Sequence, residues 1–306
     1  MSGNPEMLLV VNRAAGTAQD DRVEAAVAGL REGGDVAVAA TADADDLDEA
    51  LAAHPRHRVV VLGGDGSVHA VVAALDRAGR LSADDPVGII ACGTGNDLAR
   101  TLGLPLDPAD GAAAVLAGVP RRLDLLRDDA GAVVVNAVHA GVGAEAAAEA
   151  HRLKQRLGAV AYPVGAAIAG LGDTGWPLRV EVDGRVAVHE KEGWAADGEQ
   201  PVLMVGVCNG ATIGGGTALA PDARPDDGLA DVVVCAATGP VARAAYAAAL
   251  TAGRHLERPD VLLLRGREVR ISGGPVPVDA DGELGEVPGA GGWRLAHHAW
   301  SVLVPR

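Results

Sequence analysis

The sequence of 306 residues contains no phenylalanine and almost no lysine, since Lys154 and Lys191 are the only two. Without phenylalanine, an apolar pocket has to be lined by leucine, valine, isoleucine, alanine and the few tryptophans and tyrosines. The basic residues are nearly all arginine. A mechanism that needs a phosphate-binding lysine in the N-terminal domain therefore has no candidate.

Cysteine is scarce as well. Cys92, Cys208 and Cys235 are far apart and odd in number, which argues against a disulfide framework and against a zinc site. They are typical of small buried hydrophobic residues in a reducing compartment. No apolar run reaches the length of a membrane span, and no basic region followed by an apolar core marks a signal peptide. We therefore expect a cytoplasmic protein.

Positive charge is in deficit, because 26 lysine and arginine residues face 41 aspartate and glutamate residues, for a net charge of −15. Such a charge argues against nucleic acid as a partner. It also argues against strong adhesion to anionic lipid, so any membrane contact is expected to be weak and peripheral.

The chain is organised around the stretch HRVVVLGGDGS, residues 57–67. Its apolar run, Val59 to Leu62, is typical of a strand buried on both faces. Three glycines within four positions end this strand, and Val68 to Ala78 is predicted to be a helix. A strand, a glycine turn and a helix direct backbone N–H groups at an anion. The alternative is a tight connection that needs glycine for its geometry. The stretch is neither a Walker A loop nor the dinucleotide-binding G-x-G-x-x-G.

A second glycine turn follows about 25 residues later. Pro86 to Cys92 is predicted to be another buried strand, and it leads into GTGNDLAR, residues 93–100. Two adjacent strands that end in glycine, hydroxyl and carboxylate groups predict a phosphate and metal site at the carboxyl edge of the sheet.

Two earlier strands, Glu6 to Val11 and Asp35 to Ala40, end at Asn12 and at Thr41. The Thr41 hydroxyl could contact a nucleotide or could cap the acidic helix that follows it. Alternation of strands and helices to about Leu116 predicts a parallel sheet.

Beyond residue 120 the strands come without regular helices between them, which indicates a mostly antiparallel second domain. We place the domains at residues 1–123 and 124–306. Helices are expected at Ala144 to Leu157 and at Val241 to Ala252, and a surface hairpin loop at Glu192 to Gln200. The predicted strands are Val133–Val138, Leu178–Val182, Val202–Cys208, Ala230–Ala236, Val261–Leu264, Glu268–Ser272, Val276–Asp279 and His298–Val304.

Two polar segments of the second half could carry chemistry. One holds Asn209-Gly210, a cluster of three glycines at 214–216, and Asp226-Asp227-Gly228. The other is Asp281-Gly282-Glu283, after a strand. By themselves they are a long loop and a hairpin turn.

GGDGS followed by GTGNDLAR resembles the diacylglycerol kinase catalytic domain family, which includes bacterial lipid kinases, sphingosine kinases and ceramide kinases. The resemblance extends from Leu8 to Pro305. It implies an N-terminal α/β domain, a C-terminal β-sandwich, and an active site in the cleft between them. Where the family usually has Asn-Pro-x-Ser-Gly, this chain keeps only Asn12 and Gly16.

The resemblance also implies ATP and Mg²⁺ as cofactors and the hydroxyl of a lipid or lipid-like alcohol as acceptor. Glu283 is implied as the base, with Asp281 nearby. Asp65 and Asp97 would orient the catalytic Mg²⁺. A structural magnesium ion would bind the Asp227 carboxylate and the carbonyl oxygens of Arg224 and Leu229. The expected ATP-binding residues are Asn12, Thr41, Gly63, Gly64, Asp65, Gly66, Ser67, Gly93, Thr94, Gly95, Asn96 and Asp97.

Two other functions remain open. An NAD kinase shares the GGDG turn, although Asn96-Asp97 within GTGNDLAR fits a lipid kinase better. A non-catalytic, nucleotide-binding regulatory protein would account for the changed loop at Asn12 and for the acidity, but Asp65, Asp97 and Glu283 argue against it. The sequence leaves the acceptor open, and a homodimer is compatible with it.

Overall fold

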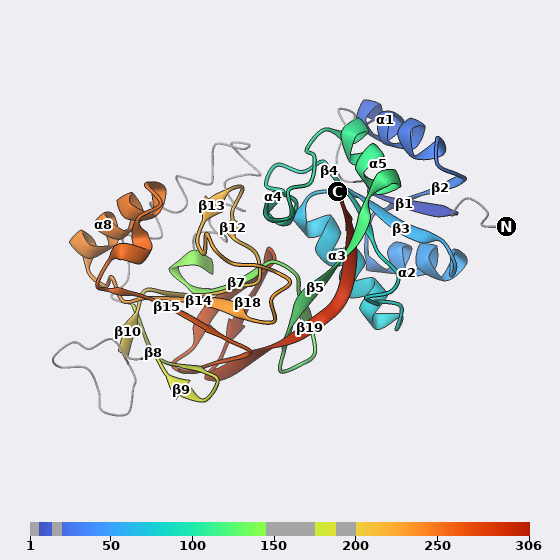
Figure 1. The fold of residues 1–306 in the computed structure, drawn as a ribbon. Coiled ribbons are helices and arrows are strands. Elements are labelled where there is room, and N and C mark those ends of the chain that lie inside the picture. The colour runs from blue at the N-terminus through green and yellow to red at the C-terminus, as the bar shows by residue number, and fades with distance from the viewer. Residues whose placement is uncertain (1–5, 14–19, 145–174, 188–199) are drawn as a thin grey trace. The chain divides into compact units, whose positions relative to one another are not determined.

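The computed structural model describes residues 6–13, 20–144, 175–187 and 200–306 (Figure 1). The chain forms two compact units. One contains the residues up to Leu125 together with His297–Arg306, and the other contains Leu126–Ala296. The expected boundary after residue 123 is two residues from the observed one. The last ten residues, which we had expected in the second domain, belong to the first unit.

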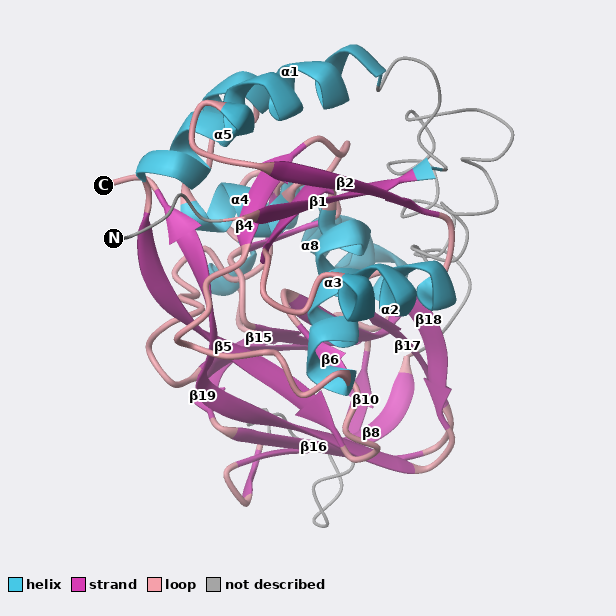
Figure 2. Ribbon diagram, turned by 90° about the vertical axis from the view of Figure 1, so that its right-hand side faces the viewer, coloured by secondary structure: helices cyan, strands magenta, loops and turns pink. Residues whose placement is uncertain are grey.

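The first unit is built on a four-stranded parallel sheet in the order β2-β1-β3-β4. Helices α1 and α5 cover one face, and α2 and α3 cover the other (Figure 2). Strands β1, β3 and β4 are buried on both faces, which explains why they are continuous apolar runs, whereas the edge strand β2 is partly exposed. The elements are β1 (Met7–Asn12), α1 (Asp20–Arg31), β2 (Val36–Thr41), α2 (Ala44–Ala53), β3 (Arg58–Gly63), α3 (Asp65–Arg77), β4 (Gly88–Ala91), α4 (Asp97–Leu102) and α5 (Pro108–Ala117).

The C-terminal segment joins the first unit beside β4. Val87 forms a parallel bridge with Val302: its N–H donates to the Ser301 carbonyl at 2.9 Å, and its carbonyl accepts the Leu303 N–H at 3.0 Å. Leu303 packs into the core shared by the sheet, α1 and α5. These bonds pair the chain end with the strand edge, which accounts for the place of the last residues in the first unit.

The second unit contains two antiparallel sheets. One has the order β10-β8-β16-β19-β5-β6, with β9 paired to β8, and the other has the order β15-β14-β11-β7-β17-β18. The chain passes between the units within β5 and again within β19. The strands are β5 (Val119–Asp128), β6 (Val133–Val134), β7 (Ala137–Gly141), β8 (Trp176–Val182), β9 (Arg185–Val186), β10 (Gln200–Val202), β11 (Met204–Cys208), β14 (Ala230–Cys235), β15 (Val261–Gly266), β16 (Glu268–Gly273), β17 (Val276–Ala280), β18 (Glu283–Val287) and β19 (Ala290–Val304).

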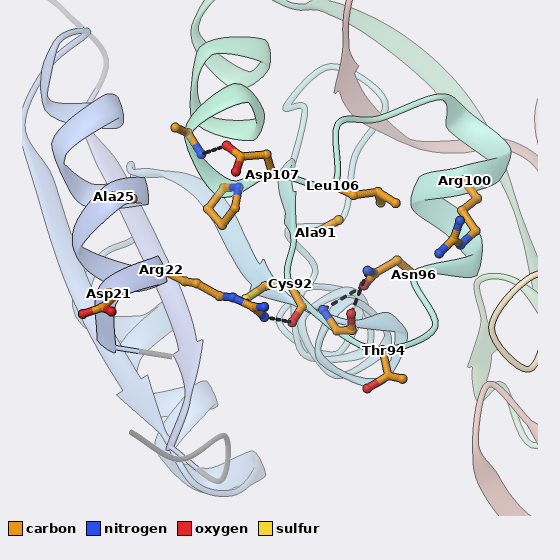
Figure 3. Close-up of a pocket in the computed structure, with 13 residues that line it drawn as sticks. Asp21, Arg22, Ala25, Ala91, Cys92, Thr94, Asn96, Arg100, Leu106 and Asp107 are labelled. Carbon is orange, nitrogen blue, oxygen red and sulfur yellow. Dashed lines mark hydrogen bonds between the residues drawn. The ribbon is translucent and has the colours of Figure 1, made fainter. Parts of the chain in front are cut away.

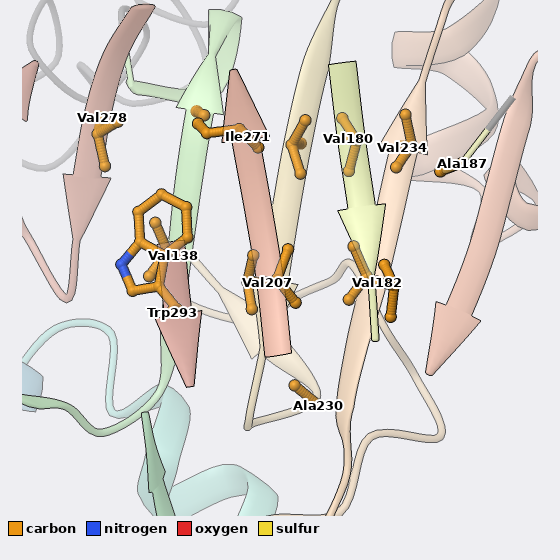
Figure 4. Close-up of a cluster of buried hydrophobic side chains, with 14 of the residues drawn as sticks. Val138, Val180, Val182, Ala187, Val207, Ala230, Val234, Ile271, Val278 and Trp293 are labelled. Atoms are coloured by element: carbon orange, nitrogen blue, oxygen red, sulfur yellow. The ribbon is translucent and has the colours of Figure 1, made fainter. Parts of the chain in front are cut away.

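The two sheets enclose a core made mainly of valine (Figure 4). Val180 and Ile271 come from one sheet and Val207 and Val234 from the other, and all are at most 1% exposed. Trp293 supplies the aromatic volume that phenylalanine would usually provide. Each fully buried side chain of this kind contributes on the order of 1.5–3 kcal/mol, so this core is a major source of the unit's stability.

The outer face of the second sheet is covered as well. Tyr246 of α8 (Pro240–Thr251) is buried there with Met204 and Leu219, beside the 3₁₀ turn His255–Glu257. A short hairpin, β12 (Thr212–Ile213) with β13 (Thr217–Ala218), precedes this region. Burial on both faces explains why β11 and β14 are apolar throughout.

Several predicted boundaries differ from the structure. Helix α3 begins at Asp65, three residues before the predicted start, so the turn at Gly63-Gly64 is shorter than expected. The predicted strand 133–138 is divided into β6 and β7, and 202–208 is divided into β10 and β11. Strands β5 and β18 were not predicted. Of the predicted helix 144–157, residues 145–157 lie outside the described residues, as do residues 192–199 of the predicted loop.

Candidate functional site

The predicted nucleotide-binding residues of the first unit lie at one edge of the parallel sheet. Asn12 pairs with Thr41 at the carboxyl ends of β1 and β2, and Gly63 pairs with Ala91 at the ends of β3 and β4. Thr41 does not cap the following helix. Asp43 does so, because its carboxylate accepts the N–H of Asp46 at 3.0 Å. The predicted edge therefore exists, and Thr41 belongs to it.

None of Gly63, Gly64, Gly66 and Gly93 has a positive φ, so backbone conformation does not explain these glycines. Three of them are needed because another part of the chain approaches them closely. A Cβ on Gly64 would lie 2.9 Å from the Cα of Gly93, and a Cβ on Gly93 would lie 2.4 Å from the Cα of Gly64. A Cβ on Gly63 would lie 2.5 Å from the Cβ and Oγ of Ser67. Gly66 differs from the others, because no atom lies within 4 Å of its Cβ position. The two turns are thus in close contact at Gly64 and Gly93, whereas Gly66 faces open space.

Asn96 holds the second turn in place. It adopts a left-handed conformation (φ 55°) and is 6% exposed. Its Oδ1 accepts the N–H of Gly93 and its Nδ2 donates to the Gly93 carbonyl, both at 2.9 Å. Asparagine tolerates this backbone better than most residues. Asn96 was predicted to bind the nucleotide, and in this structure its side chain instead fixes the shape of the glycine turn.

Asp65 links the two turns. Its Oδ1 accepts the N–H of Leu98, in the first turn of α4, at 3.1 Å. Asp97 precedes Leu98 and is 5% exposed. Gly64 is the N-cap residue of α3 and forms no side-chain cap, so its helix N-terminus is left to other acceptors. The two predicted magnesium carboxylates therefore belong to segments that are held together.

A hollow of about 450 Å³ lies beside the second turn (Figure 3). Arg22 reaches it from α1 and Arg100 from α4, while the Thr94 side chain is exposed at its rim. Arg22 Nη1 lies 3.5 Å from the Cys92 carbonyl oxygen, and Arg100 Nε donates to the Gly95 carbonyl at 3.0 Å. Sequence reasoning did not assign either arginine, although Arg100 stands within GTGNDLAR. The available signal was the absence of lysine from the first unit, which leaves arginine as the candidate for binding a phosphate there.

The hairpin at Asp281 belongs to the second unit. Asp281 (φ 52°) and Gly282 (φ 95°) form its two-residue turn between β17 and β18. The Asp281 carboxylate accepts the N–H groups of Val135, Asn136 and Ala137 at 2.5, 2.9 and 3.0 Å. This explains the break between β6 and β7, because residues 135 and 136 bond a side chain there. Asp281 therefore has a structural role that a plain turn would not require.

Glu283 is the first residue of β18, opposite Ala280, and is exposed. Asp279, which sequence reasoning did not single out, is 8% exposed, and its Oδ1 accepts the N–H of Gly282 at 2.7 Å. Burial raises the pKa of Asp279 to about 6, and the charges of Asp281 and Glu283 add to the shift. The turn that carries Glu283 is thus held by two carboxylates, those of Asp279 and Asp281.

The predicted magnesium loop is rich in carboxylates. Asp227 pairs with Arg265 and also accepts the Leu229 N–H at 3.2 Å, while Arg265 Nε lies 3.3 Å from Asp231. Asp231 is 2% exposed, and its Oδ2 has no hydrogen-bond partner among the described residues. Burial raises the pKa of Asp231, and Arg265 opposes this while Asp227 adds to it. The unpartnered Asp231 oxygen suits a hard cation such as magnesium, although Asp231 was not among the predicted ligands. Of the predicted ligands, Asp227 is already bonded by the Leu229 N–H and by Arg265.

Comparisons with known proteins agree with this architecture. Residues 6–127 match the diacylglycerol kinase catalytic domain, and residues 136–302 match the YegS C-terminal NAD kinase beta sandwich-like domain. A "Probable lipid kinase YegS-like" protein of Pseudomonas putida is 32% identical over 294 residues, covering 92% of this chain and 90% of the relative. One of the same name from Pseudomonas aeruginosa is 35% identical over 240 residues, covering 76% and 73%.

Solved structures show the same fold. A crystal structure of a diacylglycerol kinase from Bacillus anthracis covers 99% of this chain and 98% of its own, with a TM-score of 0.69 at 19% identity. A second crystal structure from the same organism reaches a TM-score of 0.77 at 21% identity, with the same coverage. With both halves of the chain matched in order, and with relatives above 30% identity over most of their length, the protein belongs to the diacylglycerol kinase catalytic domain family, in the branch that carries the YegS C-terminal domain.

Proposed function

We propose that this protein transfers the γ-phosphoryl group of ATP to a hydroxyl of a lipid or lipid-like alcohol. The observation that carries the proposal is the pair of interlocked glycine turns at the carboxyl edge of the sheet, with an uncapped helix N-terminus at Gly64. Such an edge suits phosphate groups. The curated relatives named as lipid kinases support the lipid acceptor.

In this proposal Mg²⁺–ATP supplies the phosphoryl group, and bound magnesium neutralises its charge. The backbone N–H groups of residues 63–67 and the Thr94 hydroxyl hold the phosphates. Asp65 and Asp97 hold the catalytic magnesium, and Asp227 holds a structural one. Glu283 takes the proton of the attacking hydroxyl, since an exposed carboxylate at the start of β18 is accessible to substrate.

We further propose that Arg22 and Arg100 supply the positive charge that a lysine supplies in other phosphate sites. Both line the hollow beside Thr94, and the first unit contains no lysine. Arg22→Gln and Arg100→Gln should each raise the KM for ATP about 10-fold, typical of losing one charge-assisted hydrogen bond. The control is Arg77→Gln, because Arg77 is an exposed arginine of the same unit that pairs with Asp48 at 2.8 Å.

The test of the activity is phosphoryl transfer from γ-labelled ATP to a panel of lipids in mixed micelles. The panel should include diacylglycerol, a sphingoid base and a polyprenol-type alcohol. Labelled lipid that depends on enzyme and magnesium supports the proposal. NAD is included as a further acceptor, and labelled NAD with no labelled lipid would instead identify an NAD kinase. ATP binding without transfer to any acceptor would favour a regulatory member.

A further inference from the structure

Two adjacent histidines of β19 lie on the same side of the strand, contrary to the usual alternation of side chains. His298 has a left-handed backbone, with φ 51°. As a result the rings of His297 and His298 stack with centroids 3.7 Å apart and planes 26° from parallel. A non-glycine residue adopts this backbone rarely, and surrounding structure has to hold it there. The strain calls for an explanation at this position.

The surrounding structure is a buried carboxylate on β5. Asp124 has no exposed surface, and its Oδ1 accepts both His297 Nδ1–H at 2.7 Å and the backbone N–H of His298 at 2.8 Å. The fully buried Trp300 donates its indole N–H to the Asp124 carbonyl at 3.2 Å. Asp124, His297, His298 and Trp300 all belong to the first unit. These buried hydrogen bonds thus hold the Asp124 carboxylate beside the imidazoles of His297 and His298.

One donor atom from each of Asp124, His297 and His298 lies within 4.8 Å of the other two. In the described part of the chain, no other three residues of His, Cys, Asp or Glu type come together in this way. Two imidazoles and a carboxylate are a donor set that zinc takes with three protein ligands and a water molecule. The His297 side chain is 46% exposed, which provides access for the ion and its water.

We propose that Asp124, His297 and His298 bind a divalent transition-metal ion of the zinc class. Binding uses neutral imidazoles, so the hydrogen on His297 Nδ1 moves to Nε2 and leaves the Nδ1 lone pair for the ion. The two rings, stacked in the absence of the ion, turn about their side-chain bonds until both lone pairs point at it. The ion joins β5 to β19, which are the two strands along which the chain leaves and re-enters the first unit. Because an ion that binds only the folded chain stabilises it, loading this site raises the melting temperature. This site is separate from the magnesium sites proposed above.

The test uses the full-length protein, stripped with a chelator and returned to buffer with excess magnesium. Magnesium occupies the oxygen-rich sites, so added Zn²⁺ or Co²⁺ reports the nitrogen-containing one. We expect one Zn²⁺ per chain by calorimetry. Co²⁺ in its place should give the strong visible absorption of a four-coordinate ion, which does not depend on activity.

The variants are His297→Gln and His298→Asn, each expected to lower Zn²⁺ affinity at least about 10-fold. Asparagine tolerates the left-handed backbone at 298, so that variant should keep its fold. The matched control is the double variant His54→Gln/His57→Gln. These two rings also meet, at 4.8 Å, and His57 lies 3.9 Å from Glu6, but they have no buried carboxylate. The control should bind Zn²⁺ as the wild type does.

Three results would overturn the proposal. They are no binding in wild type, binding that His297→Gln and His298→Asn leave unchanged, and a Co²⁺ spectrum like that of the aqueous ion. If one variant is unfolded by circular dichroism, the other still decides, because each removes one ligand.

Discussion

At the scale of single residues, glycine has two different roles in the paired turns. Gly64 and Gly93 are glycine because their backbones touch, whereas Gly66 has open space at its Cβ position. A ligand that approaches the turn would occupy that space. Substitution at Gly66 therefore tests ligand contact, and substitution at Gly64 tests folding.

Gly66→Ala should weaken ATP binding at least about 10-fold while the protein stays as stable as the wild type or gains up to about 1 kcal/mol, since alanine favours a helix. Gly64→Ala should instead lower the melting temperature. Calorimetric titration with ATP and thermal denaturation of both variants provide the measurements. Unchanged ATP affinity in Gly66→Ala would remove the GGDGS turn from the nucleotide site.

Glu283 is the residue that distinguishes catalysis from a simple turn. Glu283→Gln keeps the shape but cannot accept a proton, so kcat should fall by about 10²- to 10⁴-fold. ATP affinity and melting temperature should stay near wild type, because the side chain is exposed. Glu286→Gln, on the same exposed strand, is the control and should be silent. A Glu283→Gln enzyme with more than about half of wild-type kcat is not consistent with a general base at this position.

At the scale of elements, we expect the stability of the β17–β18 hairpin to depend on the ionisation of Asp279. Its folded pKa of about 6 lies above the ordinary value of 3.8. The folded state therefore binds a proton more tightly than the unfolded chain. The associated stability is fully present below pH 3.8 and is lost as the pH rises through about 6.

Asp279→Asn should consequently raise stability well above pH 6, by on the order of 2–3 kcal/mol if the whole shift counts, and should change little near pH 4. Asparagine keeps an oxygen that can accept the Gly282 N–H. Urea denaturation of wild type and variant across this pH range is the measurement. A stability difference that is the same at every pH would mean that Asp279 does not titrate in this range.

The loop at Asp227 is the other element whose charge can be tested. If it binds magnesium, the wild-type melting temperature should rise with Mg²⁺, and Asp227→Ala should abolish that rise while altering the ATP KM little. Asp129→Ala is the control, because Asp129 is a half-exposed carboxylate 3.6 Å from Arg270. A wild-type melting temperature that is independent of Mg²⁺ would mean that Arg265 alone neutralises the loop.

At the scale of the whole molecule, the net charge of −15 predicts that any membrane contact is weak. No helix in the described ranges is long and apolar enough to cross a bilayer. The helix predicted at residues 144–157 contains the basic residues His151, Arg152, Lys154 and Arg156, which lie outside the described residues. If the proposed acceptor is a lipid, we expect the protein to reach it through weak, peripheral contact, because its net charge is negative.

Sedimentation with anionic vesicles should accordingly be marginal, no stronger than with zwitterionic ones, because charge repulsion opposes it. The double variant Arg152→Glu/Lys154→Glu should change this little. Strong binding to acidic vesicles that the double variant loses would assign those residues to a membrane contact.

The sequence by itself determined most of the strands and helices, though not β5 or β18, together with the two glycine turns and the division into a parallel and an antiparallel half. These features depend on local patterns: apolar runs of strand length, glycine where a turn begins, and a change in spacing near residue 120. The tertiary structure alone decided which atoms meet. The backbone of Gly64 contacts that of Gly93, the Asp281 carboxylate accepts the N–H groups of residues 135–137, and the Asp124 carboxylate accepts the ring N–H of His297. These partners are far apart in the sequence, so no local pattern encodes them. The burial that raises the pKa of Asp279, and the pairing that brings the last ten residues to the first sheet, arise in the same way, because both depend on distant strands packing together.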